Sequence, residues 1–342
     1  MNYQVKYDEI KHVVVENNSG MRVELSECGA SIYNIEIKNE QGVYESMVLA
    51  PTDLKNFYRN PSFFGKTIGR WSGRIDKAVC EYSGKKYNLE VNWGGVNSLH
   101  GGFDGLSSRT FNHNVIDNEE YIDVEFKLEA TDNVLDGLAK YNIVYRVYKE
   151  ENTILLLLNA TCDADTLMNL TNHTFFNLSG DCKRTILNHN LYFQCNKYTR
   201  LNNELITLSI DEVNDVMDFT TKRKIGLLIE DESLQNHASN GYDHCFIKTD
   251  ENNELLAVLE EEENNMQMSI YSSYPAVVFY SGCYPDSFKV NKEAVDNVKY
   301  HSLCLEPQFI PNGVNMEGVE KAILKANEEY KHYIRYEFKR IK

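Results

Sequence analysis

The chain has 342 residues, of which 42% are hydrophobic and 11% aromatic, and this is enough to build a large buried core. Its 35 basic and 51 acidic residues give a formal net charge of −16. Such an acidic chain repels nucleic acids and anionic membrane surfaces at long range, so neither is expected as a partner.

Alternation of apolar and polar residues dominates the chain and predicts β-strands. Ile122, Val124, Phe126 and Leu128 alternate with charged residues. Residues 153–159 form a continuous apolar run, as expected for a strand that is covered on both faces. Less regular strand-like runs occupy residues 143–148, 266–271 and 333–338. Turn-rich segments separate the runs, at residues 16–20, 38–42, 116–120 and 149–152.

Helical patterns are few. Residues 52–57 suit one short helix, and residues 318–326 suit either a second helix or a loop followed by a strand. The acidic run 260–263 is interpreted as a solvated hairpin tip rather than a metal site. No linker rich in Gly, Ser or Pro and no repeat of about 20–50 residues is found. We therefore predict an all-β fold, a large antiparallel β-sandwich with few short helices, in a single domain over residues 1–342.

The eight cysteines show no CxxC pair and no spacing typical of a metal site. Several of them, such as Cys162 and Cys304, lie in apolar, strand-like surroundings. The N-terminus lacks the apolar core of a signal peptide, and no stretch approaches the ~18 apolar residues of a membrane span. These observations favour reduced, buried thiols in a cytoplasmic protein without a membrane segment.

Four polar residues stand out as the components of a proton-transfer site. His100, His173, Asp243 and Glu306 each lie in a short apolar or Gly-rich run. Two imidazoles and two carboxylates supply both a general base and a general acid near neutral pH. Because these residues are far apart in the sequence, only a fold that returns the chain to one cleft can bring them together.

Three of these residues also have structural interpretations, which the sequence leaves open. An apolar setting raises the pKa of Glu306 and makes it a better base, but a buried Glu can equally pair with an Arg. His173, next to two Phe, suits a proton donor or a hydrogen-bonded core group. The glycines after His100 either let the backbone approach a ligand or simply form a turn.

Arg70 and Arg74 lie in an irregular, Gly-containing segment and need not point the same way. An Arg there can hold a sugar hydroxyl and balance the charge of Glu306, whereas a structural ion pair is the alternative for at least one of them. The chain contains no GxSxG, HExxH, P-loop or GxGxxG motif. We therefore expect acid–base chemistry that needs neither a cofactor nor a metal.

Five segments, taken in order, resemble aldose 1-epimerases, the galactose mutarotases. They span residues 67–308, and the strand-rich remainder suits the length of that family. The segments are Gly-Arg-Trp-Ser-Gly-Arg-Ile (69–75), Asn-Ser-Leu-His-Gly-Gly (97–102), Asn-Leu-Thr-Asn-His-Thr-Phe-Phe-Asn-Leu (169–178), Asp-His (243–244) and Leu-Glu-Pro-Gln (305–308).

The resemblance implies a large β-sandwich with a sugar cleft and interconversion of the α and β anomers of a free hexose. Glu306 matches the general base and His173 the general acid, expected on opposite sides of one pyranose-sized hollow. Arg74, His100 and Asp243 match groups that hold sugar hydroxyls, with His100 near the ring oxygen. We expect a monomer or homodimer whose partner is a small-molecule sugar.

Four positions depart from the resemblance. Gly73, Phe175 and Val278, within the predicted sugar-binding set, stand where many relatives carry Asn, Tyr and Gln, and Asn312 replaces an Asp after the base. Each lost polar partner costs about 1–3 kcal/mol of recognition, so these differences bear on which sugar is bound.

Two other functions remain open on the same fold. One is a carbohydrate-binding or sensing protein without catalysis, since a fold does not determine a function. The other is an epimerase for a modified sugar, such as a phosphorylated one. The net charge of −16 disfavours an anionic substrate unless local Arg or Lys residues compensate.

Overall fold

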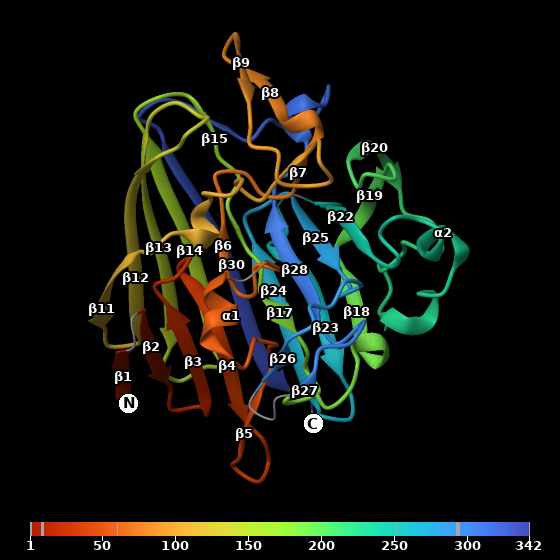
Figure 1. The fold of residues 1–342 in the computed structure, drawn as a ribbon. Helices are drawn as coiled ribbons and strands as arrows, with labels where there is room; N and C mark the ends of the chain where they lie inside the picture. The colour runs from red at the N-terminus through yellow and green to blue at the C-terminus, as the bar shows by residue number, and fades with distance from the viewer. Residues whose placement is uncertain (1, 8–9, 60, 251, 292–294, 342) are drawn as a thin grey trace.

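The computed structural model describes residues 2–7, 10–59, 61–250, 252–291 and 295–341. Strands make up most of its regular structure, and its sheets are antiparallel, which confirms the predicted all-β fold. Three large sheets form two layers, and short two-stranded pairs connect them (Figure 1).

The largest sheet has nine strands. Each strand is hydrogen bonded to its neighbours in the spatial order. The C-terminal strand lies at its centre, where it joins four strands from the first half of the chain to four from the second. In spatial order the strands are β11 (Asn112–Asp117), β12 (Tyr121–Thr131), β13 (Leu138–Tyr148), β14 (Thr153–Cys162), β30 (Glu329–Arg340), β24 (Met266–Ser272), β23 (Leu255–Glu261), β18 (Asn190–Phe193) and β21 (Arg223–Lys224).

Two further sheets pack against the nine-stranded sheet (Figure 1). The five-stranded sheet contains β1 (Asn2–Tyr7), β2 (Lys11–Glu16), β3 (Met21–Ser26), β4 (Ser31–Lys38) and β5 (Tyr44–Ser46). The six-stranded sheet contains, in spatial order, β17 (Phe175–Phe176), β28 (Leu303–Gln308), β25 (Ala276–Tyr280), β22 (Asp243–Lys248), β19 (Cys195–Leu201) and β20 (Thr207–Glu212).

Short strand pairs and helical turns make up the remaining regular structure. The pairs are β6 (Thr67–Ile68) with β16 (Thr171–Asn172), β7 (Arg74–Ile75) with β10 (Ser98–Leu99), β8 (Val79–Tyr82) with β9 (Lys85–Asn88), β15 (Thr166–Leu167) with β29 (Ile323–Leu324), and β26 (Lys289–Val290) with β27 (Val295–Asp296). The helices are α1 (Leu54–Arg59) and α2 (Glu232–Gln235), with 3₁₀ turns at Asp76–Ala78, Leu106–Ser108, Ile186–Asn188, Ile225–Leu227 and Gly313–Asn315. Among the helices of the described residues, none has the length and apolar character needed to cross a membrane.

The core lies between the layers and is continuous, because one hydrophobic cluster includes buried residues from all three large sheets. The Tyr145 hydroxyl, on the nine-stranded sheet, donates a hydrogen bond of 2.7 Å to the Ala30 carbonyl beside the five-stranded sheet. The ring centroids of Phe176, on the six-stranded sheet, and Tyr336, on the nine-stranded sheet, lie 5.5 Å apart. These contacts fix the layers relative to each other.

The predicted alternation is confirmed in β12, where Ile122, Val124 and Phe126 are buried and Leu128 is partly buried. The runs 143–148, 266–271 and 333–338 lie in β13, β24 and β30, and the predicted turns connect strands. All eight cysteines are free and buried, as expected. The predicted helix at 52–57 begins two residues later, at Leu54, and the segment 318–326 contains the short strand β29 rather than a helix.

The continuous apolar run 153–159 was expected to be covered on both faces, and this is wrong in part. Ile154, Leu156 and Leu158 face the core and are fully buried, whereas Leu155 and Leu157 are only half-buried on the outer face. The described part of the chain therefore leaves this outer face partly open to solvent.

The acidic run 260–263 does form a hairpin tip between β23 and β24, but its first two residues are not solvated as predicted. Glu260 and Glu261 end β23 and are buried. Glu260 pairs with Lys222 at 2.6 Å, and Glu261 pairs with Arg184 at 2.9 Å. A cation on an adjacent segment therefore compensates each buried carboxylate.

The one-sided burial of β14 generates a stability prediction. Leu156→Ala removes core contacts and should lower the free energy of unfolding by about 2–5 kcal/mol, whereas Leu155→Ala should cost about 1 kcal/mol or less. Urea unfolding followed by circular dichroism measures both values. Equal losses for the two variants would show that the outer face of β14 is covered after all.

Candidate active site

A cavity of about 170 Å³ opens beside the six-stranded sheet. A single water needs only about 10–15 Å³ on the same measure, so the cavity has room for a small organic molecule. Its walls contain every residue that the sequence predicts for the site. These are Gly73, Arg74, His100, His173, Phe175, Asp243, Val278 and Glu306.

Backbone pairing brings the distant segments together. β7 pairs with β10 so that Arg74 lies opposite Leu99, next to His100. β6 pairs with β16, which places His173 directly after a strand anchored to the Arg74 segment. β28 pairs with β17 on one side and with β25 on the other, where Val278 lies opposite Glu306. The cleft is therefore built by sheet hydrogen bonds rather than by loops alone.

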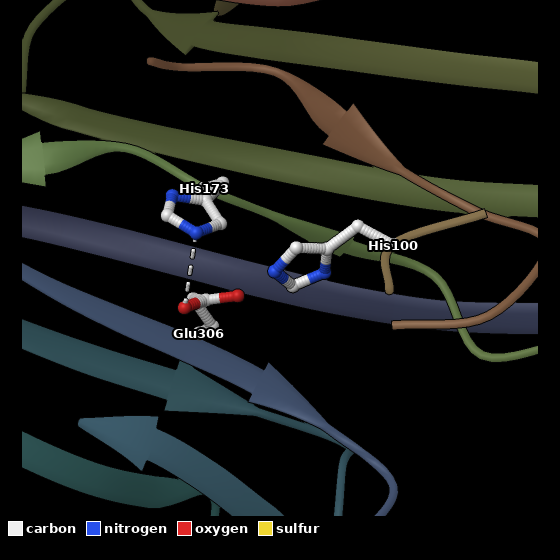
Figure 2. Close-up of side chains that lie close together, drawn as sticks. All are labelled: His100, His173 and Glu306. Carbon is white, nitrogen blue, oxygen red and sulfur yellow. Dashed lines mark ion pairs between the residues drawn. The ribbon is translucent and has the colours of Figure 1, made fainter. Parts of the chain in front are cut away.

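Glu306 and His173 are neighbours in the cavity wall. Glu306 Oε1 lies 3.6 Å from His173 Nε2, and both side chains are almost completely buried (Figure 2). They were expected on opposite sides of the hollow, but they lie side by side. Their separation is slightly longer than a hydrogen bond.

Burial shifts both groups toward their neutral forms. It raises the pKa of Glu306 well above 4.5, and nearby Asp243 adds to this shift while Arg74 opposes it. Burial also lowers the pKa of His173 from 6.5 to about 4. When the pair holds one proton, both shifts favour the state in which Glu306 is protonated and His173 is neutral. The alternative, a carboxylate beside an imidazolium, is disfavoured because a buried site penalises each charged form.

His100 faces the same pair, and its hydrogen bonds fix its tautomer. The Gly73 amide donates to His100 Nδ1 at 3.1 Å, and the His100 amide donates to the Gly73 carbonyl at 3.2 Å. Since Nδ1 accepts a hydrogen bond, the neutral ring carries its proton on Nε2. Burial, with smaller contributions from His173 and Arg74, lowers the pKa of His100 well below 6.5. His100 therefore presents a neutral N–H donor.

Gly73 contributes backbone rather than a side chain to this arrangement. Its φ is +74°, and a Cβ atom built there would lie 2.6 Å from the Pro311 side chain. An Asn at this position would have to displace Pro311. Gly73 positions His100 through its backbone, and its contact with a sugar stays a prediction.

Arg74 and Asp243 form an ion pair at the cavity wall. Arg74 Nη2 lies 3.0 Å from Asp243 Oδ2, and the guanidinium stacks over Trp93 at 4.7 Å. Arg74 Nε is buried and lacks a hydrogen-bond partner among the described residues. The pair therefore offers both a donor and an acceptor to a ligand, held in fixed positions.

Arg70 points away from the cavity, which confirms that the two arginines have different directions. Its guanidinium donates to the Asp136 and Gly137 carbonyls at 2.8 and 2.9 Å. It also donates to the Thr166 hydroxyl at 3.0 Å. The structural role considered for Arg70 is therefore met by backbone carbonyls and a hydroxyl rather than by an ion pair.

Phe175 and Val278 make two sides of the cavity apolar. The Phe175 ring packs on Phe64 at 4.3 Å and on His173 at 5.1 Å. Asn312 lies outside the cavity, where its side-chain oxygen accepts a hydrogen bond of 3.1 Å from the Asp76 amide. Its role is to hold a loop.

Sequence reasoning missed several lining residues. Gln308 ends the Leu-Glu-Pro-Gln segment, and its side chain lies 3.5 Å from Glu306 Oε2, so its position in that segment was the available signal. Phe63, Trp93 and Tyr284 reach the cavity from irregular segments. No periodic pattern marks such residues.

The three groups drawn in Figure 2 also have the composition of a metal site, since ligand atoms of His100, His173 and Glu306 all lie within 4.8 Å of one another. Histidine ligands usually donate their second ring N–H to an acceptor. His100 does the opposite, because its Nδ1 accepts from the Gly73 amide and its Nε2 carries the proton. The hydrogen bonding therefore fits a proton-transfer site better than a metal site.

Comparison with known proteins agrees with this site. Residues 11–337 match the family described as Aldose 1-epimerase. Galactose mutarotase of Sus scrofa is 29% identical over 316 residues, which cover 91% of this chain and 89% of the relative. Aldose 1-epimerase of Streptococcus thermophilus is 26% identical over 346 residues, which cover 98% and 96%.

A solved structure of an aldose epimerase homologue from C. elegans has a TM-score of 0.86 at 25% identity, covering 97% of this chain and 100% of that one. The galactose 1-epimerase structure from Lactobacillus acidophilus, at 24% identity and a TM-score of 0.85, shares the fold. Fold and relatives together define a β-sandwich carbohydrate isomerase. The chain belongs to the aldose 1-epimerase family.

The hydrogen bonds of His100 generate a spectroscopic prediction. At pH 6.5 its ring should be neutral and protonated on Nε2, because its pKa lies well below 6.5. Nitrogen–proton correlation spectra of the imidazole rings, assigned with the variant His100→Gln, measure both properties. A ring that is half-charged at pH 6.5, or protonated on Nδ1 when neutral, would contradict the assignment.

Proposed function

We propose that the protein interconverts the α and β anomers of a free hexose by general acid–base catalysis, with Glu306 as the base and His173 as the acid. The observation that supports this most directly is the separation of 3.6 Å between Glu306 Oε1 and His173 Nε2 inside a ligand-sized cavity. The relatives named galactose mutarotase and aldose 1-epimerase add support for this reaction class.

Ring opening needs two proton transfers at neighbouring atoms. Glu306 takes the proton of the C1 hydroxyl, while His173 Nε2 gives a proton to the ring oxygen and the bond between C1 and that oxygen breaks. Both oxygens are bonded to C1, so the groups that serve them need to be adjacent rather than opposed. This accounts for the side-by-side arrangement of the pair.

The open aldehyde then rotates about the C1–C2 bond and closes on its other face with the roles reversed. Glu306 returns its proton to the carbonyl oxygen, and His173 takes the proton back from the attacking hydroxyl. The pair therefore holds one proton throughout and ends in its starting state. Burial favours the stage in which both groups are neutral, which is the stage that coexists with the open sugar.

Arg74, Asp243 and His100 are assigned to the sugar hydroxyls. The ion pair offers a donor and an acceptor, and His100 offers the N–H of Nε2. Among the described residues that line the cavity, Arg74 is the only Lys or Arg, and Asp243 already compensates its charge. No free cation is then available for a phosphate, and this favours a neutral sugar over a phosphorylated one.

A binding protein without catalysis is less well supported. Burying a carboxyl group next to an imidazole costs stability, and hydroxyl recognition alone does not need that pair. Arg74, Asp243 and His100 would suffice to hold a sugar.

The proposed roles predict large kinetic effects. Glu306→Gln and His173→Gln should each lower the enzymatic rate of mutarotation by about 10²–10⁴-fold, because each removes one proton-transfer group and keeps a similar volume. Polarimetry of a freshly dissolved hexose measures the rate after the spontaneous rate is subtracted. His332→Gln is the matched control, since His332 stacks on Tyr274 outside the cavity. Near wild-type rates for both site variants would refute the proposed function.

The shared proton predicts a bell-shaped dependence of kcat/KM on pH. Below the lowered pKa of His173, about 4, both groups are protonated and no base remains, so activity falls as pH drops through this value. Above the raised pKa of Glu306 the pair has lost its proton and no acid remains. Rates measured across the pH range test both limbs, and an acid limb near 6.5, the ordinary value for imidazole, would disagree with this assignment.

A further inference from the structure

The two ring nitrogens of His173 have different partners. Nε2 faces Glu306, as the dashed line in Figure 2 shows, and the other nitrogen points away from the carboxylate. That nitrogen, Nδ1, lies 3.5 Å from the sulfur of Cys304. The partner of Nδ1 decides which nitrogen is free to exchange a proton.

The other side chains around His173 are rings that offer Nδ1 no strong acceptor. The ring contacts Phe175 at 5.1 Å and Phe63 at 5.9 Å, and His100 packs edge-on at 5.2 Å. The carbonyl of His173 itself accepts from the Gly65 amide at 2.9 Å, and it also interacts with the His173 ring and raises the pKa of that ring. Among the hydrogen bonds of the described residues, Nδ1 has one, to Cys304 Sγ.

The fold explains why Cys304 occupies this place. It lies on β28 two residues before Glu306, and alternate residues of a strand face the same side. Its cross-strand partner is Phe175, which follows His173 by two residues. One strand therefore supplies a partner to each nitrogen of His173. Cys304 is fully buried and does not line the cavity.

We infer that Cys304 is a positioning residue, whose sulfur accepts a hydrogen bond from Nδ1–H of His173 and thereby confines proton exchange to Nε2. This inference rests on the proposed function. Burial raises the pKa of the Cys304 thiol well above 9, so the sulfur stays an uncharged acceptor and does not take the proton itself. His173 is then neutral as the Nδ1–H tautomer, the opposite of His100.

Kinetics of two substitutions test this role. Cys304→Ala removes the acceptor and should lower kcat about tenfold with KM unchanged, because a buried N–H loses its partner while the cavity wall is untouched. Cys304→Ser keeps an acceptor at this position and should restore kcat to within about threefold of wild type. Cys80→Ala, which truncates an equally buried thiol on β8, should leave kcat unchanged.

A second measurement does not depend on turnover. Nitrogen–proton correlation spectra of the wild-type protein should show neutral His173 protonated on Nδ1, and Cys304→Ala should shift the ring toward a mixture of tautomers. Wild-type kcat in folded Cys304→Ala, equal losses in the Ala and Ser variants, or a wild-type Nε2–H tautomer would each overturn the inference. If Cys304→Ala does not fold, the wild-type spectrum and the Ser variant decide. Failure of the proposed function would appear instead as unaffected rates in Glu306→Gln and His173→Gln.

Discussion

The central constraint on the cavity is that the carboxyl group of Glu306 and the imidazole ring of His173 are buried together. Their nearest atoms lie 3.6 Å apart. In water each group would titrate independently at its ordinary pKa. Desolvation moves the pKa of Glu306 up and that of His173 down, and the proposed function uses the two groups as one acid–base pair. The rings of Phe63 and Phe175 pack against His173 and help to exclude water from the pair.

The antiparallel sheets provide the necessary rigidity. Glu306 and Cys304 lie on β28, which hydrogen bonds to strands on both sides, and His173 lies between two strands that are each paired to a different segment. Reciprocal backbone bonds between Gly73 and His100 set the third ring. Side chains held in this way need little rearrangement when a ligand enters, and such preorganisation is what acid–base catalysis requires.

Local patterns predicted much of this architecture, and the errors have a common physical cause. The alternation at Ile122–Phe126 reports one buried face directly, so β12 could be read from the sequence. The burial of Leu155 and Glu261 could not be predicted in the same way, because it depends on which distant segment covers each residue. Seven of the eight site residues, all but Val278, lie in recognisable motifs, whereas Trp93 and Phe63 reach the cavity from irregular loops whose path depends on tertiary packing.

The central place of β30 in the nine-stranded sheet has a consequence for biosynthesis. This last strand fills the gap between β14 and β24, so both neighbours keep unpaired backbone edges until residues 329–340 leave the ribosome. Exposed edges of this kind invite pairing with other chains. The nascent protein therefore passes through an aggregation-sensitive interval that ends only when β30 has been made, and removal of β30 would leave both edges unpaired.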